Sequence, residues 1–113
     1  MLRVRMRFPE LRPADYGSSV HAELRDTSIA DASHPTVAEA WAHVSPDIHE
    51  IELTIDVAEG RLAPGHRYSL WAHVGQGSAG HLRRGDLITA VDIPVTADDV
   101  AASAVLAVPL TRI

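Results

Sequence analysis

The sequence predicts an all-β protein, a small antiparallel β-sandwich of about seven strands with an immunoglobulin/transthyretin-like arrangement. Several short segments alternate between apolar and polar residues with period two, which is typical of half-buried strands. Glycine and proline separate these segments at short intervals, and no long segment has the 3.6-residue period of a helix. The 113 residues fit a single domain, 1–113, because domains usually hold about 100–150 residues.

The alternation is clearest at the start of the chain. Apolar residues occupy the even positions of residues 2–8, and Arg3, Arg5 and Arg7 occupy the odd positions between them. One face of this strand is therefore expected in the core and the other in solvent. The same criteria predict further strands over residues 19–25, 50–57, 68–74, 87–95 and 104–110.

Two segments carry helix signals. In residues 36–44, Thr36 and Glu39 have the spacing of a helix capping box, but the segment also alternates as a strand would, so local evidence leaves both open. Residues 96–99 have the sequence Thr-Ala-Asp-Asp, which predicts a cap for about one helical turn before the last strand.

The composition excludes several classes of chemistry. The chain has no cysteine, which excludes disulfides, thiolate metal sites and cysteine nucleophiles, and no lysine, which excludes lysine Schiff bases. The net charge of −5 argues against a nucleic-acid partner. No apolar run reaches the ~18 residues of a membrane span, and we expect no cofactor. We expect a cytoplasmic protein if Met1 is the native start, and otherwise a mature envelope-associated fragment.

Residues 20–32 carry the most specific motif in the chain. They resemble the V-x-L-x-D-x-S-x-A-D-A signature of the YbaY family of bacterial lipoproteins. That family is related to the YscW-type pilotins, outer-membrane lipoproteins that assist the assembly of type III secretins. The motif positions in this chain are Val20, Leu24, Asp26, Ser28, Ala30, Asp31 and Ala32.

The resemblance extends over roughly residues 18–96. It implies a single YbaY-like β-sandwich domain, and it favours a strand for residues 36–44. Family members usually carry a signal peptide and a lipid-bearing cysteine, and this sequence has neither, so membrane anchoring is not carried over. The resemblance implies no catalytic residue, and residues 104–113 lie outside it.

Asp26, Ser28 and Asp31 are the acidic and hydroxyl residues of the motif. They could form a cation site, but the central glycine and the bidentate glutamate of an EF-hand loop are absent. A turn stabilised by side-chain hydrogen bonds to nearby backbone N–H groups is favoured. Ser28 or Ser69 could serve a hydrolase, although no G-x-S-x-G motif surrounds either serine.

Seven histidines raise the possibility of a metal site. The best pair is His43 and His73, each the centre of an Ala-His-Val triplet. If their strands pair, the two imidazoles could be neighbours on one face. The alternative interpretation is that the histidines are scattered over the surface.

Three arginines and one tryptophan are the candidate interaction residues. Arg3, Arg5 and Arg7 form a basic stripe, whereas residues 47–59 are acidic without any arginine. The two segments could be cross-strand partners, or either could be a docking surface. Trp71 would be a binding hot spot if it is exposed, and part of the core if the register is reversed.

These observations support three hypotheses on function. The first is a non-enzymatic binding, scaffolding or chaperone-like module with a protein partner, which is bound at an exposed sheet edge or at Trp71 and the arginine stripe. The second is a small-ligand or metal-binding protein that uses surface histidines. The third is an enzyme of unknown class. A homodimer through an edge strand is a further prediction.

Overall fold

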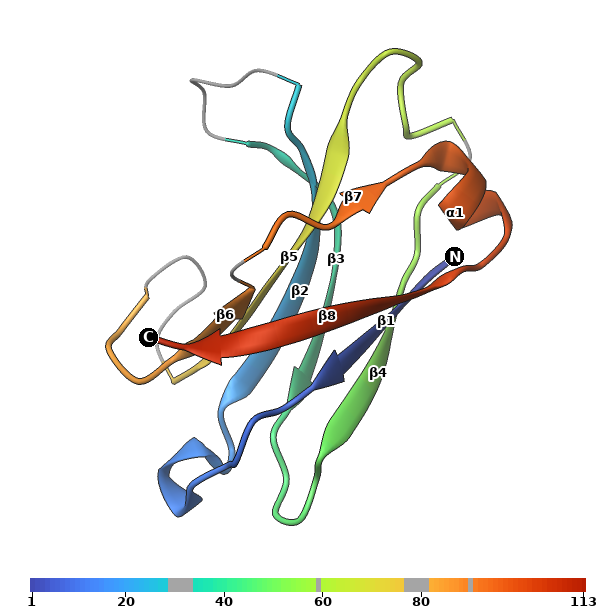
Figure 1. Ribbon diagram of the computed structural model, residues 1–113. Coiled ribbons are helices and arrows are strands. Elements are labelled where there is room, and N and C mark those ends of the chain that lie inside the picture. The colour runs from blue at the N-terminus through green and yellow to red at the C-terminus, as the bar shows by residue number, and fades with distance from the viewer. Residues whose placement is uncertain (29–33, 59, 77–81, 90) are drawn as a thin grey trace.

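The computed structural model describes the whole chain except residues 29–33, 59, 77–81 and 90. Within the described part, one 3-10 turn (Pro13–Asp15) and one short helix, α1 (Ala97–Ala101), accompany the strands (Figure 1). The strands are β1 (Leu2–Arg7), β2 (Ser19–Asp26), β3 (Thr36–His43), β4 (Glu50–Ile55), β5 (Tyr68–Gly75), β6 (Leu87–Thr89), β7 (Pro94–Val95) and β8 (Val105–Arg112).

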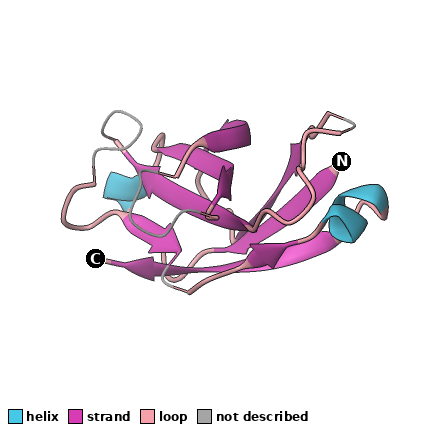
Figure 2. Cartoon of the chain, turned by 90° about the horizontal axis from the view of Figure 1, so that it is seen from above, coloured by secondary structure: helices cyan, strands magenta, loops and turns pink. Residues whose placement is uncertain are grey.

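The strands form one sheet in the order β3-β2-β5-β6-β8-β1-β4, and β7 pairs with β5 outside this path. The sheet curves around the core (Figure 2). Its two end strands, β3 and β4, lie near each other. The all-β prediction is confirmed. The sandwich and its immunoglobulin/transthyretin-like arrangement are not confirmed, because the strands belong to a single, nearly closed sheet rather than to two packed sheets.

One strand pair also departs from the antiparallel prediction. β1 and β8 are parallel, with Val4 opposite Leu106 and Met6 opposite Val108. The first strand of the chain lies between β4 and the last strand, so β1 and β8 are neighbours in the sheet. Alternation within a strand predicts which side chains face the core, but it carries no information about the direction of the neighbouring strand.

Alternation places the core as expected. Leu2, Val4 and Met6 of β1 are fully buried, while the arginines between them are exposed. The opposite wall is built by Val20, Ala22 and Leu24 of β2, which are also fully buried. Further buried apolar residues in the described part of the chain are Phe8, Val44, Leu53, Ile55, Tyr68, Leu70, Ala72, Val74, Leu87, Val95, Val108 and Leu110.

The ambiguous segment is a strand, and the helix alternative for residues 36–44 is wrong. Ala38 and Ala40 of β3 face Leu24 and Ala22 of β2, so the alanines lie on the inner side of the sheet. Pairing along the full length of β2 outweighs the high helix propensity of these alanines, because tertiary context overrides local propensity. Because its inner side chains are small, β3 contributes little bulk to the core.

The predicted cap before the last strand is confirmed. The Thr96 hydroxyl accepts a hydrogen bond from the Asp99 N–H at 3.1 Å, and the Asp99 carboxylate accepts one from the Thr96 N–H at 2.9 Å. This reciprocal capping box starts α1. Among the described residues, no helix is long and apolar enough to cross a membrane.

The segment 87–95, expected as one strand, is divided into β6 and β7. β6 pairs with His73 and Val74 near the end of β5, whereas β7 pairs with Tyr68 and Ser69 at its start. β6 also pairs with β8, which β7 does not. β7 therefore lies beside the start of β5 and away from β8.

Candidate functional site

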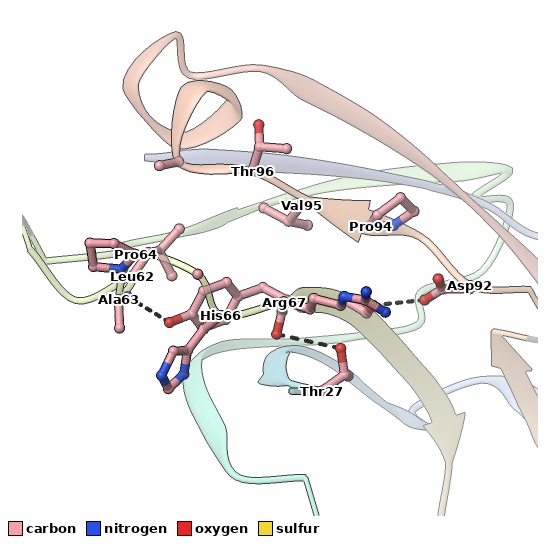
Figure 3. Close-up of a pocket in the computed structure, with 14 residues that line it drawn as sticks. Thr27, Leu62, Ala63, Pro64, His66, Arg67, Asp92, Pro94, Val95 and Thr96 are labelled. Carbon is pink, nitrogen blue, oxygen red and sulfur yellow. Dashed lines mark hydrogen bonds between the residues drawn. The ribbon is translucent and has the colours of Figure 1, made fainter. Parts of the chain in front are cut away.

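An apolar groove lies where β7 and α1 approach the connection between β4 and β5. Its larger section has a volume of about 530 Å³. Figure 3 shows Leu62 and Pro64 on the β4–β5 connection and Pro94 and Val95 on β7. Tyr68, at the start of β5, also lines this section.

A second section of about 430 Å³ adjoins the first, because Leu62 and Ala97 line both. It is lined by Val57 on one side and by Val100 of α1 on the other. The two sections together form a surface depression along α1 that is lined mainly by apolar side chains. We call it the α1 groove.

Turns in the β4–β5 connection give the α1 groove its wall. Gly60 and Gly65 have φ values of +76° and +80°, a region that glycine adopts without steric cost. Between them the Ala63 N–H donates a hydrogen bond to the Tyr68 hydroxyl at 2.7 Å. Tyr68 is itself buried, so this bond fixes the connection against the rigid start of β5.

A polar network lies at the end of β2, beside the larger section of the groove. The Asp26 carboxylate accepts hydrogen bonds from the Ser28 hydroxyl at 2.6 Å and the Ser28 N–H at 3.0 Å. The Nδ1 atom of His66 lies 2.7 Å from the second carboxylate oxygen of Asp26, Oδ2. The Ser28 hydroxyl bond and then the His66 bond lower the pKa of Asp26 to about 2. The turn interpretation of Asp26 and Ser28 is thus confirmed.

This network does not have the geometry of a hydrolase. The Ser28 hydroxyl donates to Asp26 and accepts from the Arg67 N–H, and within the described part of the chain no histidine is hydrogen-bonded to it. The Ser69 hydroxyl likewise donates to a carboxylate, that of Asp92, at 2.7 Å. Both serines considered from the sequence thus donate their hydroxyl hydrogen bonds to carboxylates.

A second group of polar residues lies on the outer face of β2 and β3. His21 and Glu23 are only 5% and 7% exposed, although their positions face away from the core. The His21 ring stacks on Trp41 with a centroid distance of 3.8 Å and an interplanar angle of 8°. Its Nε2 atom lies 2.7 Å from Glu39 Oε2, and its Nδ1 atom lies 3.8 Å from Glu23 Oε1.

Arg25 and Trp71 complete this face. Arg25 donates to both carboxylate oxygens of Glu23, at 2.7 and 3.2 Å. Its guanidinium carbon lies 5.0 Å from the centre of the Trp71 ring, within cation–π range. Trp71 faces away from the core, in the predicted register, and is half-buried. We call His21, Glu23, Arg25, Glu39, Trp41 and Trp71 the β2 outer cluster.

The predicted histidine pair is not brought together as supposed. His43 on β3 and His73 on β5 belong to strands that do not pair, because β2 lies between them. His43 is exposed and lies opposite Ser19. His73 is buried, and its Nε2 atom lies 2.7 Å from Asp86 Oδ2. The premise of strand pairing is therefore wrong, while metal binding itself remains a prediction.

A glycine makes room for the carboxylate beside His73. A Cβ atom on Gly75 would lie 2.6 Å from the Asp86 carboxylate, so a side chain at this position would force Asp86 to move. The carboxylate also accepts the Arg83 N–H at 2.9 Å. Gly75 therefore acts here through its lack of a side chain.

The arginine stripe faces the acidic strand. Arg5 lies 3.4 Å from Glu50 and 3.5 Å from Glu52 of β4, and Arg7 lies 3.9 Å from Glu50. Arg3 instead donates to the Ser103 carbonyl at 3.1 Å. The cross-strand interpretation of these charges is confirmed by the ion pairs. The use of the stripe as a docking surface remains a prediction.

The motif residues divide into core and turn positions. Val20 and Leu24 are fully buried, which explains their apolar character without any role in binding. Asp26 and Ser28 form the turn described above. Ala30, Asp31 and Ala32 lie outside the described residues.

Comparison with known proteins finds a match to this fold among the solved structures. No family model and no curated protein matches the sequence. A solved structure does match: that of an alternative pilotin from the type II secretion system of Vibrio cholerae, with a TM-score of 0.76 and 21% sequence identity over 99% of this chain and 95% of that chain. This chain has the fold of that pilotin. The finding agrees with the pilotin side of the predicted relationship, whereas the YbaY resemblance stays a prediction.

Sequence patterns did not predict the α1 groove or the β2 outer cluster. Leu62, Val95 and Val100 belong to three separate segments whose proximity follows from the closure of the sheet. His21 and Glu23 occupy polar positions of a strand and were expected in solvent. The signal for the cluster was the presence of tryptophans on the same outer faces, since a large ring beside a polar side chain can bury it.

Proposed function

We propose that this chain is a non-enzymatic, chaperone-like protein-binding module whose α1 groove takes an apolar segment of a protein partner. The pilotin fold, which extends over 99% of the chain, is the observation that carries the proposal. The polar groups beside the groove support it, because both candidate serine nucleophiles donate to carboxylates and neither is hydrogen-bonded to a histidine among the described residues.

The groove has the composition that such a partner needs. Leu62 and Val100 offer apolar surface, and burial of apolar area drives most protein association. At the rim, the Ser69 hydroxyl and the Asp92 carboxylate offer polar contacts that can fix the direction of the bound segment. We propose a segment with alternating or helically spaced apolar side chains and a basic residue near Asp92.

A groove-filling substitution tests this function. Ala97 is exposed at the start of α1 and lines both sections of the groove, so Ala97→Trp should fill the space without disturbing the core. Ala102→Trp is the matched control, because Ala102 is exposed at the other end of α1 and does not line the groove. A photoreactive amino acid placed at each position in host cells would identify what lies against it.

We expect a specific protein to be cross-linked from position 97 and not from position 102. A peptide from the cross-linked segment should bind the wild type and Ala102→Trp equally, and Ala97→Trp at least about tenfold more weakly, which corresponds to roughly 1.4 kcal/mol. Equal binding to all three proteins, or cross-links shared by both positions, would contradict the proposal. The identity of the captured protein would also distinguish a cytoplasmic from an envelope setting.

The sheet edges provide a second route to partners, which is the predicted homodimer. β3 and β4 each have strand partners on one side only in the described structure. An unpaired edge can accept another strand, and β3 carries the more apolar sequence of the two. We propose β3 as the dimer edge. Light scattering at increasing concentration tests this, and a strict monomer would refute it.

A further inference from the structure

The three ligand-type side chains of the β2 outer cluster converge. One donor atom from each of His21, Glu23 and Glu39 lies within 4.8 Å of the other two. The residues come from two paired strands, with Glu23 directly opposite Glu39 and His21 two positions before Glu23. Their convergence is therefore a property of the paired backbone as well as of flexible side-chain ends.

We propose that His21, Glu23 and Glu39 bind a divalent transition metal ion, with Zn²⁺ as the representative ion. Imidazole nitrogen and carboxylate oxygen are both common ligands of zinc. Zinc is frequently bound by three protein ligands, and a water molecule then completes its coordination. Ligand atoms around zinc lie about 2.0–2.2 Å from the metal, so they are roughly 3.3 Å apart. The observed separations reach up to 4.8 Å, so the ligand atoms must move closer together on binding. Glu39 lies at Nε2 of the imidazole whereas Glu23 Oε1 faces Nδ1, so coordination through Nε2 requires the Glu23 carboxylate to turn toward that side of the ring.

Neighbouring side chains hold the ligands in place. The Trp41 ring lies flat against His21 at 3.8 Å and restricts the imidazole to one plane. Arg25 holds the Glu23 carboxylate through two hydrogen bonds. Outer contacts that orient metal ligands commonly improve metal affinity, and this site has such a contact on two of its three residues.

The charges also favour a cation. Two carboxylates and one arginine leave the cluster with a formal charge of −1 when His21 is neutral, before any metal binds. Glu23 Oε1 is the oxygen that faces His21 and makes the longer of the two Arg25 bonds, 3.2 Å. A carboxylate oxygen has two lone pairs, so Oε1 can keep its arginine contact and still coordinate a metal.

An entry path is present on the Glu39 side. The side chain of Glu39 is 48% exposed, whereas those of His21 and Glu23 are 6% and 10% exposed. An ion from solvent therefore meets Glu39 first and replaces the hydrogen bond between Glu39 and His21 Nε2. This site is separate from the α1 groove, so metal binding goes beyond the proposed protein-binding function.

Zinc titration of the chelator-treated protein tests the proposal. We expect calorimetry to show one equivalent of Zn²⁺, and the ¹⁵N resonance of the coordinating His21 nitrogen to shift on binding. Glu39→Gln keeps the shape of an exposed side chain but removes its charge, and it should weaken binding by about tenfold or more. His43→Gln is the control, because His43 is an exposed histidine on the same strand.

Each result decides for or against the site. Glu39→Gln at reduced affinity and His43→Gln at wild-type affinity would support it, with thermal unfolding showing that both variants are folded. No zinc uptake by the wild type would overturn it. Equal affinity of Glu39→Gln and wild type, or loss of binding in His43→Gln, would overturn it as well, since the ion would then be held by other surface histidines.

Discussion

Charged residues lie on two outer faces of the same sheet, and their side chains differ in solvent exposure between the two faces. On β1 and β4, Arg5 and Glu50 pair in solvent with side chains 50% and 42% exposed. On β2, the side chains of His21 and Glu23 are only 6% and 10% exposed, although they also point away from the core. The difference comes from the neighbours: long charged chains flank the first pair, whereas Trp41 and Trp71 flank the second.

Alternation therefore identifies the face of a strand but not its degree of burial. A polar residue beside tryptophan rings loses water and must be paired, while one beside other charged chains keeps its water. We expect the two faces to differ in how much their pairs contribute to stability, and in how much salt affects them.

The largest effect is expected from Glu23→Ala. It removes the partner of Arg25 and a neighbour of His21 where little water can replace them. We expect a loss of about 2–3 kcal/mol in the free energy of unfolding, measured by urea denaturation. The matched control is Glu52→Ala on the exposed face. If Glu23→Ala lowered the free energy of unfolding no more than Glu52→Ala does, the two faces would not differ in their contribution to stability.

A smaller effect is expected from Trp41→Ala, which removes the stack on His21 and exposes the imidazole. Aromatic stacking of this kind contributes about 0.5–1.5 kcal/mol beyond the area it buries, so we expect a loss of roughly 1 kcal/mol. Leu82→Ala serves as the control, because Leu82 is 47% exposed and Trp41 is 50% exposed. The thermal unfolding midpoint should fall clearly for Trp41→Ala and hardly for Leu82→Ala. Equal shifts of the midpoint would contradict a specific role for the stack.

Arg5→Ala should change stability by less than about 0.5 kcal/mol, because exposed ion pairs contribute little. The small effect that remains should disappear in concentrated salt, which screens exposed charges, whereas the effect of Glu23→Ala should persist. Urea unfolding at low and high salt would compare them. A salt-independent loss above 1 kcal/mol for Arg5→Ala would show that the exposed pairs are stronger than this comparison allows.

The smallest effect concerns a single proton in the exposed Asp26 network. The pKa of Asp26 is lowered to about 2, so its ionised form is favoured in the folded state. Any contribution to stability is present above the ordinary value of 3.8 and is lost as the pH falls towards 2. Ser28→Ala removes the first cause of the shift, and NMR titration should show a higher midpoint. An unchanged midpoint would contradict a role for the Ser28 hydroxyl and leave His66 and the backbone N–H of residue 28 as the groups that lower the pKa.

How much of this could be predicted from the sequence varies by element. The period-two pattern in residues 2–8 correctly assigned the buried face of β1, because side-chain direction in a strand is a local property. The Thr96–Asp99 cap was also local, and it was confirmed. The division of 87–95 into β6 and β7 could not be predicted, since it depends on which strands lie beside the segment.

The sites depend on long-range geometry even more strongly. His21 becomes a candidate ligand only when β3 brings Glu39 beside it. The pair His43 and His73 was chosen from matching triplets, which say nothing about the strand that separates them. The sequence supplies the chemical types, and the order of strands decides which of them meet.

The parallel pairing of β1 with β8 has a mechanical consequence. The first and last strands of the chain run in the same direction, and the two termini lie at opposite ends of this pair (Figure 1). A force that pulls the termini apart therefore slides β1 along β8 and loads their hydrogen bonds together, rather than opening them one after another. If the chain bridges two larger structures by its ends, this geometry resists tension at the point where the load enters.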